Sequence, residues 1–125
     1  MLGDEQVRQL VRRFTDAFES GEVSSILDLL TDDVTFSMPP FPGEARGRDE
    51  VADSWLMPQN SPTGLRYARA TANGQVALGC YSRVGVDRYL PIALDVLTLE
   101  GELISSVTAF RTPEMFPRFG LPTEL

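Results

Sequence analysis

Hydrophobic residues recur with two different periods along this chain, and the periods divide it into helical and extended segments. From Asp4 to Ser20 they return every three or four residues, which predicts an amphipathic helix that Gly21 ends. A second, shorter helix is predicted from Val23 to Leu30, stopping at Thr31-Asp32-Asp33. A third is predicted to follow Gly47-Arg48, where two acidic residues suit a first helical turn. The first half of the chain is therefore mainly helical.

The second half of the chain shows the alternation that is typical of strands. Val34 to Met38 already alternates apolar and hydroxyl side chains, and β-branched and aliphatic residues dominate later segments. Turns are expected at Asn73-Gly74 and Glu100-Gly101-Glu102, because both sequences supply the backbone freedom that a hairpin needs. The further strands are expected at Leu65–Ala72, Gln75–Val84, Arg88–Leu99 and Leu103–Arg111, with a short terminal helix at Pro113–Phe119.

This order of elements predicts an α+β fold in which a strongly curved antiparallel sheet packs against three helices. The hollow of such a sheet, lined by apolar residues with a few polar groups, is where a ligand is expected to bind. A length of 125 residues corresponds to a single domain that spans residues 1–125.

Composition excludes several classes of function. The net charge of -7 argues against a nucleic-acid surface, which needs clustered cations. The N-terminus has no secretory signal, and no apolar run approaches the length of about 20 residues that spans a membrane. A cytoplasmic protein without a membrane partner is therefore expected. With no His and the single Cys80, no metal site and no cofactor are expected.

Asp95 breaks the pattern of the hairpin from Pro91 to Arg111. It lies between Leu94 and Val96 in an arm that is otherwise apolar up to Leu99. Its carboxylate either turns to solvent or an Arg, or is carried into the apolar interior. In the second case burial would raise its pKa and make it a candidate functional group.

The motifs LLTDDVTFSMPP and GELISSVTAF, in this order of elements, resemble the NTF2-like superfamily, and most closely its SnoaL-like group. The segments TFSMPPFPGEARGRDEV and PEMFPRFGLP resemble the C-terminal SnoaL-like domain of some extracytoplasmic-function sigma factors, although no upstream sigma-factor helices are expected here. The resemblance implies an NTF2-like cone, a homodimer formed through the outer sheet face, and a pocket for a small hydrophobic organic ligand.

Comparison with the ketosteroid isomerase branch of this superfamily implies which of that branch's catalytic groups have a counterpart in this chain. By motif, Phe14 stands where that branch has a Tyr, Met38 stands where it has the catalytic base, and Asp95 stands where it has the oxyanion-binding Asp. The similar SnoaL-like cyclases and epoxide hydrolases carry an acid on the last strand, where this chain has Thr108. Of the catalytic acids in these relatives, only the one at Asp95 has a counterpart in this chain.

Two functions of different classes follow. The first is an enzyme acting on a hydrophobic metabolite, as cyclase, isomerase or epoxide hydrolase, with Asp95 as acid or base and Tyr81 and Thr108 as hydrogen-bond donors. The second is a non-catalytic binding or regulatory module, as the sigma-factor likeness implies. Parity leaves open which faces of the strands at 65–72 and 75–84 line the pocket. The expected pocket residues are Phe14, Ser37, Met38, Trp55, Tyr67, Arg83, Leu97 and Phe110.

Overall fold

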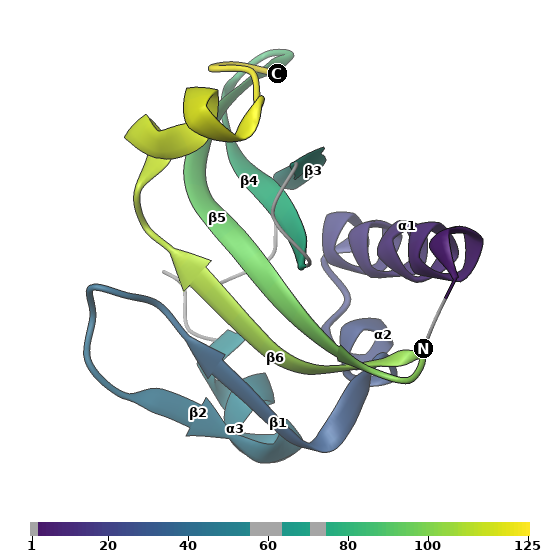
Figure 1. Ribbon diagram of the computed structural model, residues 1–125. Helices are drawn as coiled ribbons and strands as arrows, with labels where there is room; N and C mark the ends of the chain where they lie inside the picture. The colour runs from purple at the N-terminus through teal and green to yellow at the C-terminus, as the bar shows by residue number, and fades with distance from the viewer. Residues whose placement is uncertain (1–2, 56–63, 71–74) are drawn as a thin grey trace.

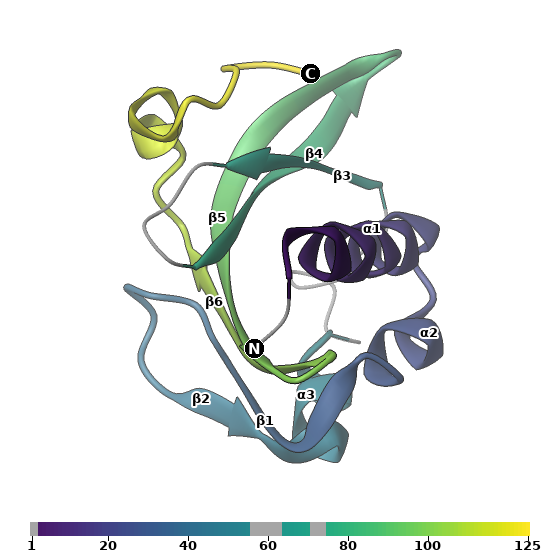
Figure 2. The ribbon, with the colours of Figure 1, turned by 45° about the vertical axis from the view of Figure 1, so that its right-hand side comes forward.

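The chain folds into a strongly curved sheet whose concave side holds the N-terminal helices. The computed structural model describes residues 3–55, 64–70 and 75–125. Two views of the ribbon show α1 lying inside the curve of the sheet (Figures 1 and 2). The elements are α1 Asp4–Ser20, α2 Val23–Leu27, β1 Leu30–Ser37, β2 Glu44–Arg46, α3 Gly47–Trp55, β3 Leu65–Ala70, β4 Val76–Gly85, β5 Arg88–Glu100, β6 Leu103–Phe110 and the 3-10 helix η2 Pro113–Phe119.

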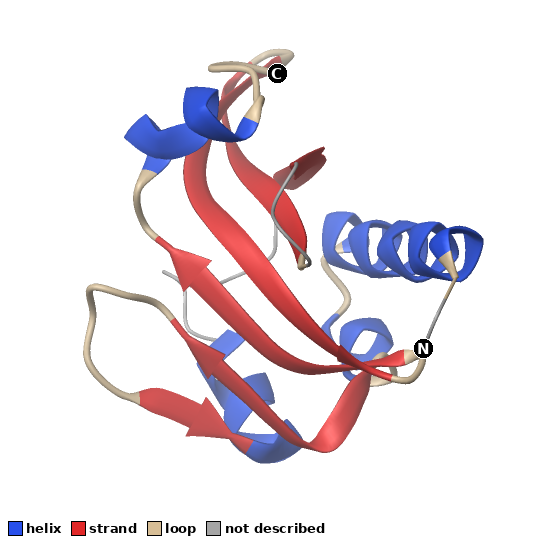
Figure 3. Ribbon diagram, viewed as in Figure 1, coloured by secondary structure: helices blue, strands red, loops and turns tan. Residues whose placement is uncertain are grey.

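Six strands form one sheet in the order β2-β1-β6-β5-β4-β3 (Figure 3). Every neighbouring pair is antiparallel except β1 and β6, which run parallel. The predicted α+β fold with a curved sheet is thus confirmed, and the expectation of antiparallel pairing is corrected for this one pair.

Helix α1 has the predicted bounds. The backbone N–H of Gly3 donates to Gln6 Oε1 at 2.9 Å and so satisfies one of the free N–H groups at its start. At its end Gly21 adopts a left-handed conformation with φ of 76°, which a residue without Cβ reaches at no steric cost. The apolar stripe is buried against the sheet at Leu10, Val11, Phe14 and Phe18.

The second helix and the first strand differ from their predicted bounds. Helix α2 ends at Leu27, and Leu30 is already the first residue of β1, where it pairs with Ile104. A short apolar run is compatible with a helix or with a buried strand. Here the pairing of Leu30 with β6 makes it part of the strand. Strand β2, Glu44–Arg46, was not predicted, because its three residues carry no β-branched side chain.

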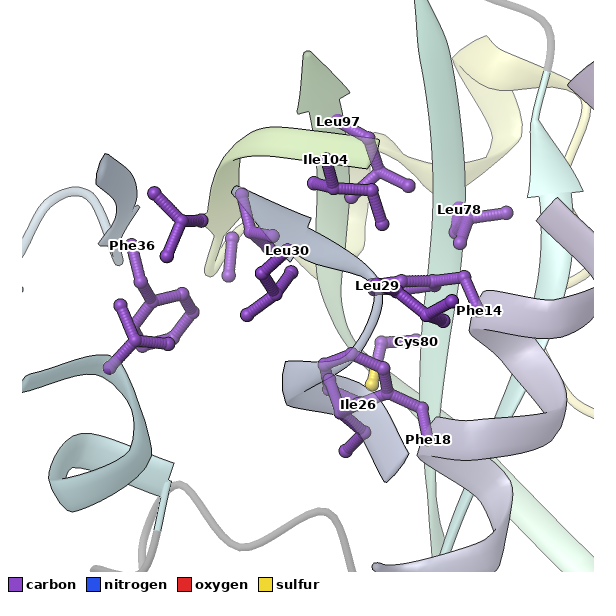
Figure 4. Close-up of a cluster of buried hydrophobic side chains, with 14 of the residues drawn as sticks. Phe14, Phe18, Ile26, Leu29, Leu30, Phe36, Leu78, Cys80, Leu97 and Ile104 are labelled. Carbon is purple, nitrogen blue, oxygen red and sulfur yellow. The ribbon is translucent and has the colours of Figure 1, made fainter. Parts of the chain in front are cut away.

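Two hydrophobic clusters occupy opposite faces of the sheet. The concave core joins α1, α2 and α3 to side chains such as Val34, Leu78 and Leu97, and Figure 4 shows its centre around Phe14 and Phe18. The convex cluster joins η2 and the segment after it to the other face. Its buried members are Ala70, Ala77, Tyr81, Leu94, Phe116 and Leu121.

The segment after η2 is tied to the convex face by backbone and side-chain contacts. Tyr89 and Leu125 exchange backbone hydrogen bonds at 3.0 and 2.9 Å, and Arg88 pairs with Glu124. The close approach needs a glycine at position 79, where an added Cβ would lie 2.8 Å from Leu121 Cδ1. The predicted helix at Pro113–Phe119 is confirmed, as a 3-10 helix.

The expected Asn73-Gly74 turn lies outside the described residues. In the part of the chain that the structure describes, no helix combines the length and the apolar character needed to cross a membrane.

Candidate functional site

A small cavity lies between the concave face of the sheet and helices α1 and α3. This inner cavity has a volume of about 60 Å³, and its walls are mainly apolar. It has room for several water molecules, but it is smaller than the range of about 300 to 1,000 Å³ that is common for drug-sized ligands. Its lining residues are Phe18, Phe36, Met38, Trp55, Leu65, Tyr67, Cys80, Ile92, Ala93, Asp95, Val107, Ala109 and Arg111.

Aromatic rings make one wall of the inner cavity rigid. The ring of Trp55 lies edge-on to Phe18 and to Phe36, with centroid distances of 5.0 and 5.5 Å. Phe18 also meets Tyr67 edge-on at 5.5 Å. Such edge-to-face pairs hold the rings in defined orientations, so the wall presents a fixed apolar surface.

Asp95 is the buried acid of the inner cavity. Its side chain comes from the middle of β5, flanked by Leu78 on one neighbouring strand and Ala109 on the other. The residue is only 5% exposed, and burial raises the pKa of its carboxyl from 3.8 to about 7, against the opposing effect of Arg111. The expectation that Asp95 enters the interior is confirmed, while its catalytic role stays a prediction.

Arg111 supplies the cationic group of the inner cavity, and the sequence analysis did not select it. Its backbone N–H donates to Pro39 O at 3.1 Å, and its Nη2 donates to the Met38 sulfur at 3.7 Å. These contacts hold the guanidinium beside Asp95, close enough to lower the pKa of that carboxyl. The alternation of Val107 and Ala109, continued one residue past the end of β6, is a weak sequence signal for this position.

Tyr67 and Cys80 form a polar cross-strand pair in the same cavity. They are opposite each other in the β3–β4 ladder, and both line the inner cavity. Burial, with the charge of Asp95 nearby, raises the pKa of the Tyr67 phenol and of the Cys80 thiol well above their ordinary values. Both groups therefore stay neutral at physiological pH, and Cys80 is not a thiolate nucleophile.

Four of the expected site residues come together in the inner cavity: Asp95, Met38, Trp55 and Tyr67. Phe14 and Leu97 are buried in the core of the concave face, where Figure 4 labels both, and they do not line the cavity. Ser37 lines a separate hollow near the Pro39–Gly43 loop. Sequence reasoning missed Arg111 and several apolar wall residues, among them Phe18, Phe36 and Val107.

Tyr81 and Thr108, expected as hydrogen-bond donors beside Asp95, belong to the opposite face of the sheet. Tyr81 is fully buried in the convex cluster, and its hydroxyl donates to Pro122 O at 2.6 Å. Thr108 pairs with Val96, the neighbour of Asp95, so alternation turns it away from the cavity. Their expected roles beside Asp95 are therefore wrong.

Arg83 and Phe110, expected in the pocket, do not reach it either. Arg83 is exposed near the end of β4, where its Nε donates to Gly85 O at 3.2 Å. Phe110 pairs with Leu94, a member of the convex cluster, and its side chain is 37% exposed. For Arg83 the sequence left open which face of its strand lines the pocket, whereas Phe110 was assigned to the pocket and lies on the other face of β6.

A wider depression of about 710 Å³ lies elsewhere on the surface. It is lined by charged, mostly exposed side chains, and its acids Asp28 and Asp32 lie 3.8 and 3.6 Å from the guanidinium of Arg48. Within residues 3–55, 64–70 and 75–125 no three His, Cys, Asp or Glu side chains are placed to hold a metal ion. The inner cavity, with its buried acid, is therefore the candidate site.

The fold is that of NTF2-like proteins. A solved NTF-2 like protein of unknown function from Burkholderia xenovorans superposes with a TM-score of 0.68 at 15% identity, covering 85% of this chain and 82% of its own. A candidate ketosteroid isomerase from Kribbella flavida gives a TM-score of 0.61 at 23% identity, covering 85% of this chain and 77% of its own. At these identities the likeness shows the fold alone.

Residues 11–90 match the model of the SnoaL-like domain, and the chain belongs to this family. It is 34% identical over 122 residues to the ECF RNA polymerase sigma factor SigG of Mycobacterium tuberculosis. The match covers 96% of this chain but only 33% of the sigma factor, so the chain spans about a third of the length of that relative. The predicted family and the predicted likeness to an extracytoplasmic-function sigma factor are confirmed.

Proposed function

We propose that this SnoaL-like domain binds a compact, mainly apolar organic molecule and holds its polar group with Asp95 and Arg111. The observation that carries the proposal is the carboxyl of Asp95, 5% exposed inside an apolar cavity. An acid in such a place destabilises the fold unless it is paired or neutral, so its presence favours a role in binding.

The polar groups of the inner cavity define the chemistry of the ligand. With a pKa of about 7, Asp95 is present in both forms near neutral pH. Its neutral form donates a hydrogen bond to a carbonyl or hydroxyl oxygen, whereas its ionised form only accepts. Arg111 only donates, and the Tyr67 hydroxyl is available on the neighbouring wall. A ketone, a lactone or an alcohol fits this arrangement.

Binding without chemistry is supported by the lack of a second acid. Among the described residues that line the inner cavity, Asp95 is the only carboxyl group, and Met38 stands where relatives of the isomerase branch carry a base. The sequence relation to a sigma factor supports a regulatory role for binding. The domain would then respond to its ligand rather than convert it.

Catalysis is the second candidate, and one observation favours it. A pKa of about 7 is the value at which a general acid or base works best at neutral pH. Asp95 would then transfer the proton, with Tyr67 and Arg111 in place of the donors expected from the sequence. The reactions would be those of a cyclase, an isomerase or an epoxide hydrolase acting on a hydrophobic metabolite.

The single tryptophan provides a direct test, because Trp55 is the only one in the chain and lines the inner cavity. We expect its fluorescence to change when small ketones, polycyclic ketones or epoxides are titrated into the protein. Replacing Asp95→Leu removes the hydrogen bond at nearly constant shape and should weaken ketone binding about tenfold. Turnover of each compound is measured in the same samples, and turnover that Asp95→Leu abolishes favours the enzyme.

The matched control is Asp87→Asn, which changes an exposed turn acid with positive φ, a conformation that Asn tolerates well. It should leave ketone binding unchanged. The proposal fails if no compound of the panel alters the Trp55 signal, or if Asp95→Leu and Asp87→Asn behave alike.

We also propose a homodimer through the outer sheet face, as the family resemblance implied. Phe110 supports it, since this large apolar residue is 37% exposed on the convex face beside the half-buried Val96. Sedimentation of the wild type and of Phe110→Ser tests the point. A wild type that sediments as a monomer at every concentration contradicts it.

A further inference from the structure

A second hollow adjoins the inner cavity at the loop between β1 and β2. This outer hollow has a volume of about 200 Å³ and includes Ser37, Phe41, Glu44 and Ala45 in its lining. The two hollows have two wall residues in common, Phe36 and Met38. They are therefore neighbours that share part of their walls.

We propose that the outer hollow is a second subsite for the same ligand, which reaches from Asp95 past Met38 to Phe41. This inference rests on the proposed function and adds the shape of the ligand. The two volumes together come near about 300 Å³, the lower end of the range for small-molecule sites, whereas the inner cavity alone is far below it. An elongated molecule uses both hollows, and a compact one uses the inner cavity alone.

Met38 is suited to stand between the two subsites. It is half-buried, and its unbranched thioether side chain turns more easily than the aromatic rings of the wall. Arg111 Nη2 donates to its sulfur at 3.7 Å, so the guanidinium lies beside a residue that lines both hollows. A ligand that displaces the Met38 side chain takes over the place of that sulfur next to Arg111.

The lining of the outer hollow indicates which part of the ligand it takes. Phe41 is 59% exposed and, with Pro42 and Ala45, offers apolar surface that an alkyl chain would cover. Glu44 carries the charge of this hollow and is paired with Arg46 at 2.6 Å, so its carboxylate is already compensated. The ligand class is thus an elongated ketone or related carbonyl compound, with its oxygen at Asp95 and its alkyl chain at Phe41.

Two ketones of different length distinguish binding at the inner cavity from binding at the outer hollow. Butan-2-one is short enough for the inner cavity, whereas the chain of nonan-2-one must pass Met38. Replacing the exposed Phe41→Ala should weaken nonan-2-one binding about fourfold or more, the equivalent of at least one methylene returned to water, and leave butan-2-one binding unchanged. Both affinities are measured by NMR titration of the full chain.

Val86→Ala is the matched control, because Val86 is an apolar residue that is 84% exposed and lines neither hollow. It should change neither affinity. The ε-methyl resonance of Met38, assigned from its loss in Met38→Leu, should shift more with nonan-2-one than with butan-2-one.

The outcomes separate this inference from the proposed function. Binding of both ketones that depends on Asp95 but is unaffected by Phe41→Ala overturns the outer subsite alone. The same holds if Phe41→Ala weakens both ketones equally. Failure of the wild type to bind either ketone overturns the subsite and the proposed function together.

Discussion

Asp95 lies directly opposite Ala109 in the antiparallel ladder of β5 and β6. This register turns Thr108, the next residue back along β6, to the other face of the sheet. The acid therefore has Arg111, Tyr67 and Cys80 as its polar surroundings in the inner cavity, and no hydroxyl from the last strand.

Stability should fall between about pH 4 and about pH 7 because of Asp95. Its carboxyl has a raised pKa in the folded protein, so folding favours the protonated form, and the stabilisation is lost as pH rises from 3.8 to about 7. At about 1.4 kcal/mol for each pH unit, the loss amounts to about 4 kcal/mol, and stability changes no further through this group above that range.

Urea unfolding of the wild type and of Asp95→Asn at pH 5 and pH 8 measures this effect. Asn imitates the neutral acid at every pH, so the variant should gain stability relative to the wild type as pH rises. A constant difference between the two proteins would show that the carboxyl does not titrate in this range.

Ketone affinity should fall as pH rises through 7. A carbonyl oxygen needs a donor, and only the protonated Asp95 donates, so affinity should drop up to about tenfold between pH 6 and pH 8. Asp95→Asn keeps a donor and should bind with the same affinity at both values. Trp55 fluorescence reports the binding, and an affinity of the wild type that is independent of pH contradicts the prediction.

Gly79→Ala should destabilise the fold. The new Cβ would lie 2.8 Å from Leu121 Cδ1 and 3.1 Å from Phe116 Cε2, so the convex cluster must shift. We expect a loss of about 1 to 3 kcal/mol in the free energy of unfolding. Gly85→Ala is the matched control on the same strand, because no atom lies within 4 Å of the added carbon, and equal losses in both variants would refute the clash.

Removing one hydroxyl from each face of the sheet should separate stability from binding. Tyr81→Phe deletes the hydrogen bond to Pro122 O and should lower the free energy of unfolding by about 1 kcal/mol while ketone affinity is unchanged. Tyr67→Phe deletes a hydroxyl of the inner cavity and should weaken ketone binding several-fold. Weaker binding in Tyr81→Phe would mean that its hydroxyl does reach the ligand.

Period and turn chemistry were enough to predict most of the fold. The stripe of α1, the glycine that ends it and the hairpin of β5 and β6 are all local patterns, and the structure confirms them. The parallel pairing of β1 with β6 and the short strand β2 depend on contacts distant in sequence. Local sequence does not encode such contacts, and so Leu30 was assigned to a helix.

The candidate site was predicted only in part, for a similar reason. The polarity of Asp95 in an apolar arm marked it as unusual, and the structure buries its side chain as that pattern allowed. The register between strands, which decides that Ala109 rather than Thr108 meets Asp95, is set by pairing over the whole ladder. Arg111 follows the last residue of β6, where strand alternation is no longer a firm guide.

Strand β4 is shared by the two hydrophobic clusters, since Leu78 and Cys80 face the helices while Ala77 and Tyr81 face the C-terminal segment. A mutational scan along this strand should therefore show a period of two in its phenotypes. Between Val76 and Tyr81, substitutions at even positions should alter the concave core and the candidate site, whereas those at odd positions should loosen the C-terminal segment. Neighbouring residues in the buried half of one strand should therefore give two different kinds of mutant phenotype.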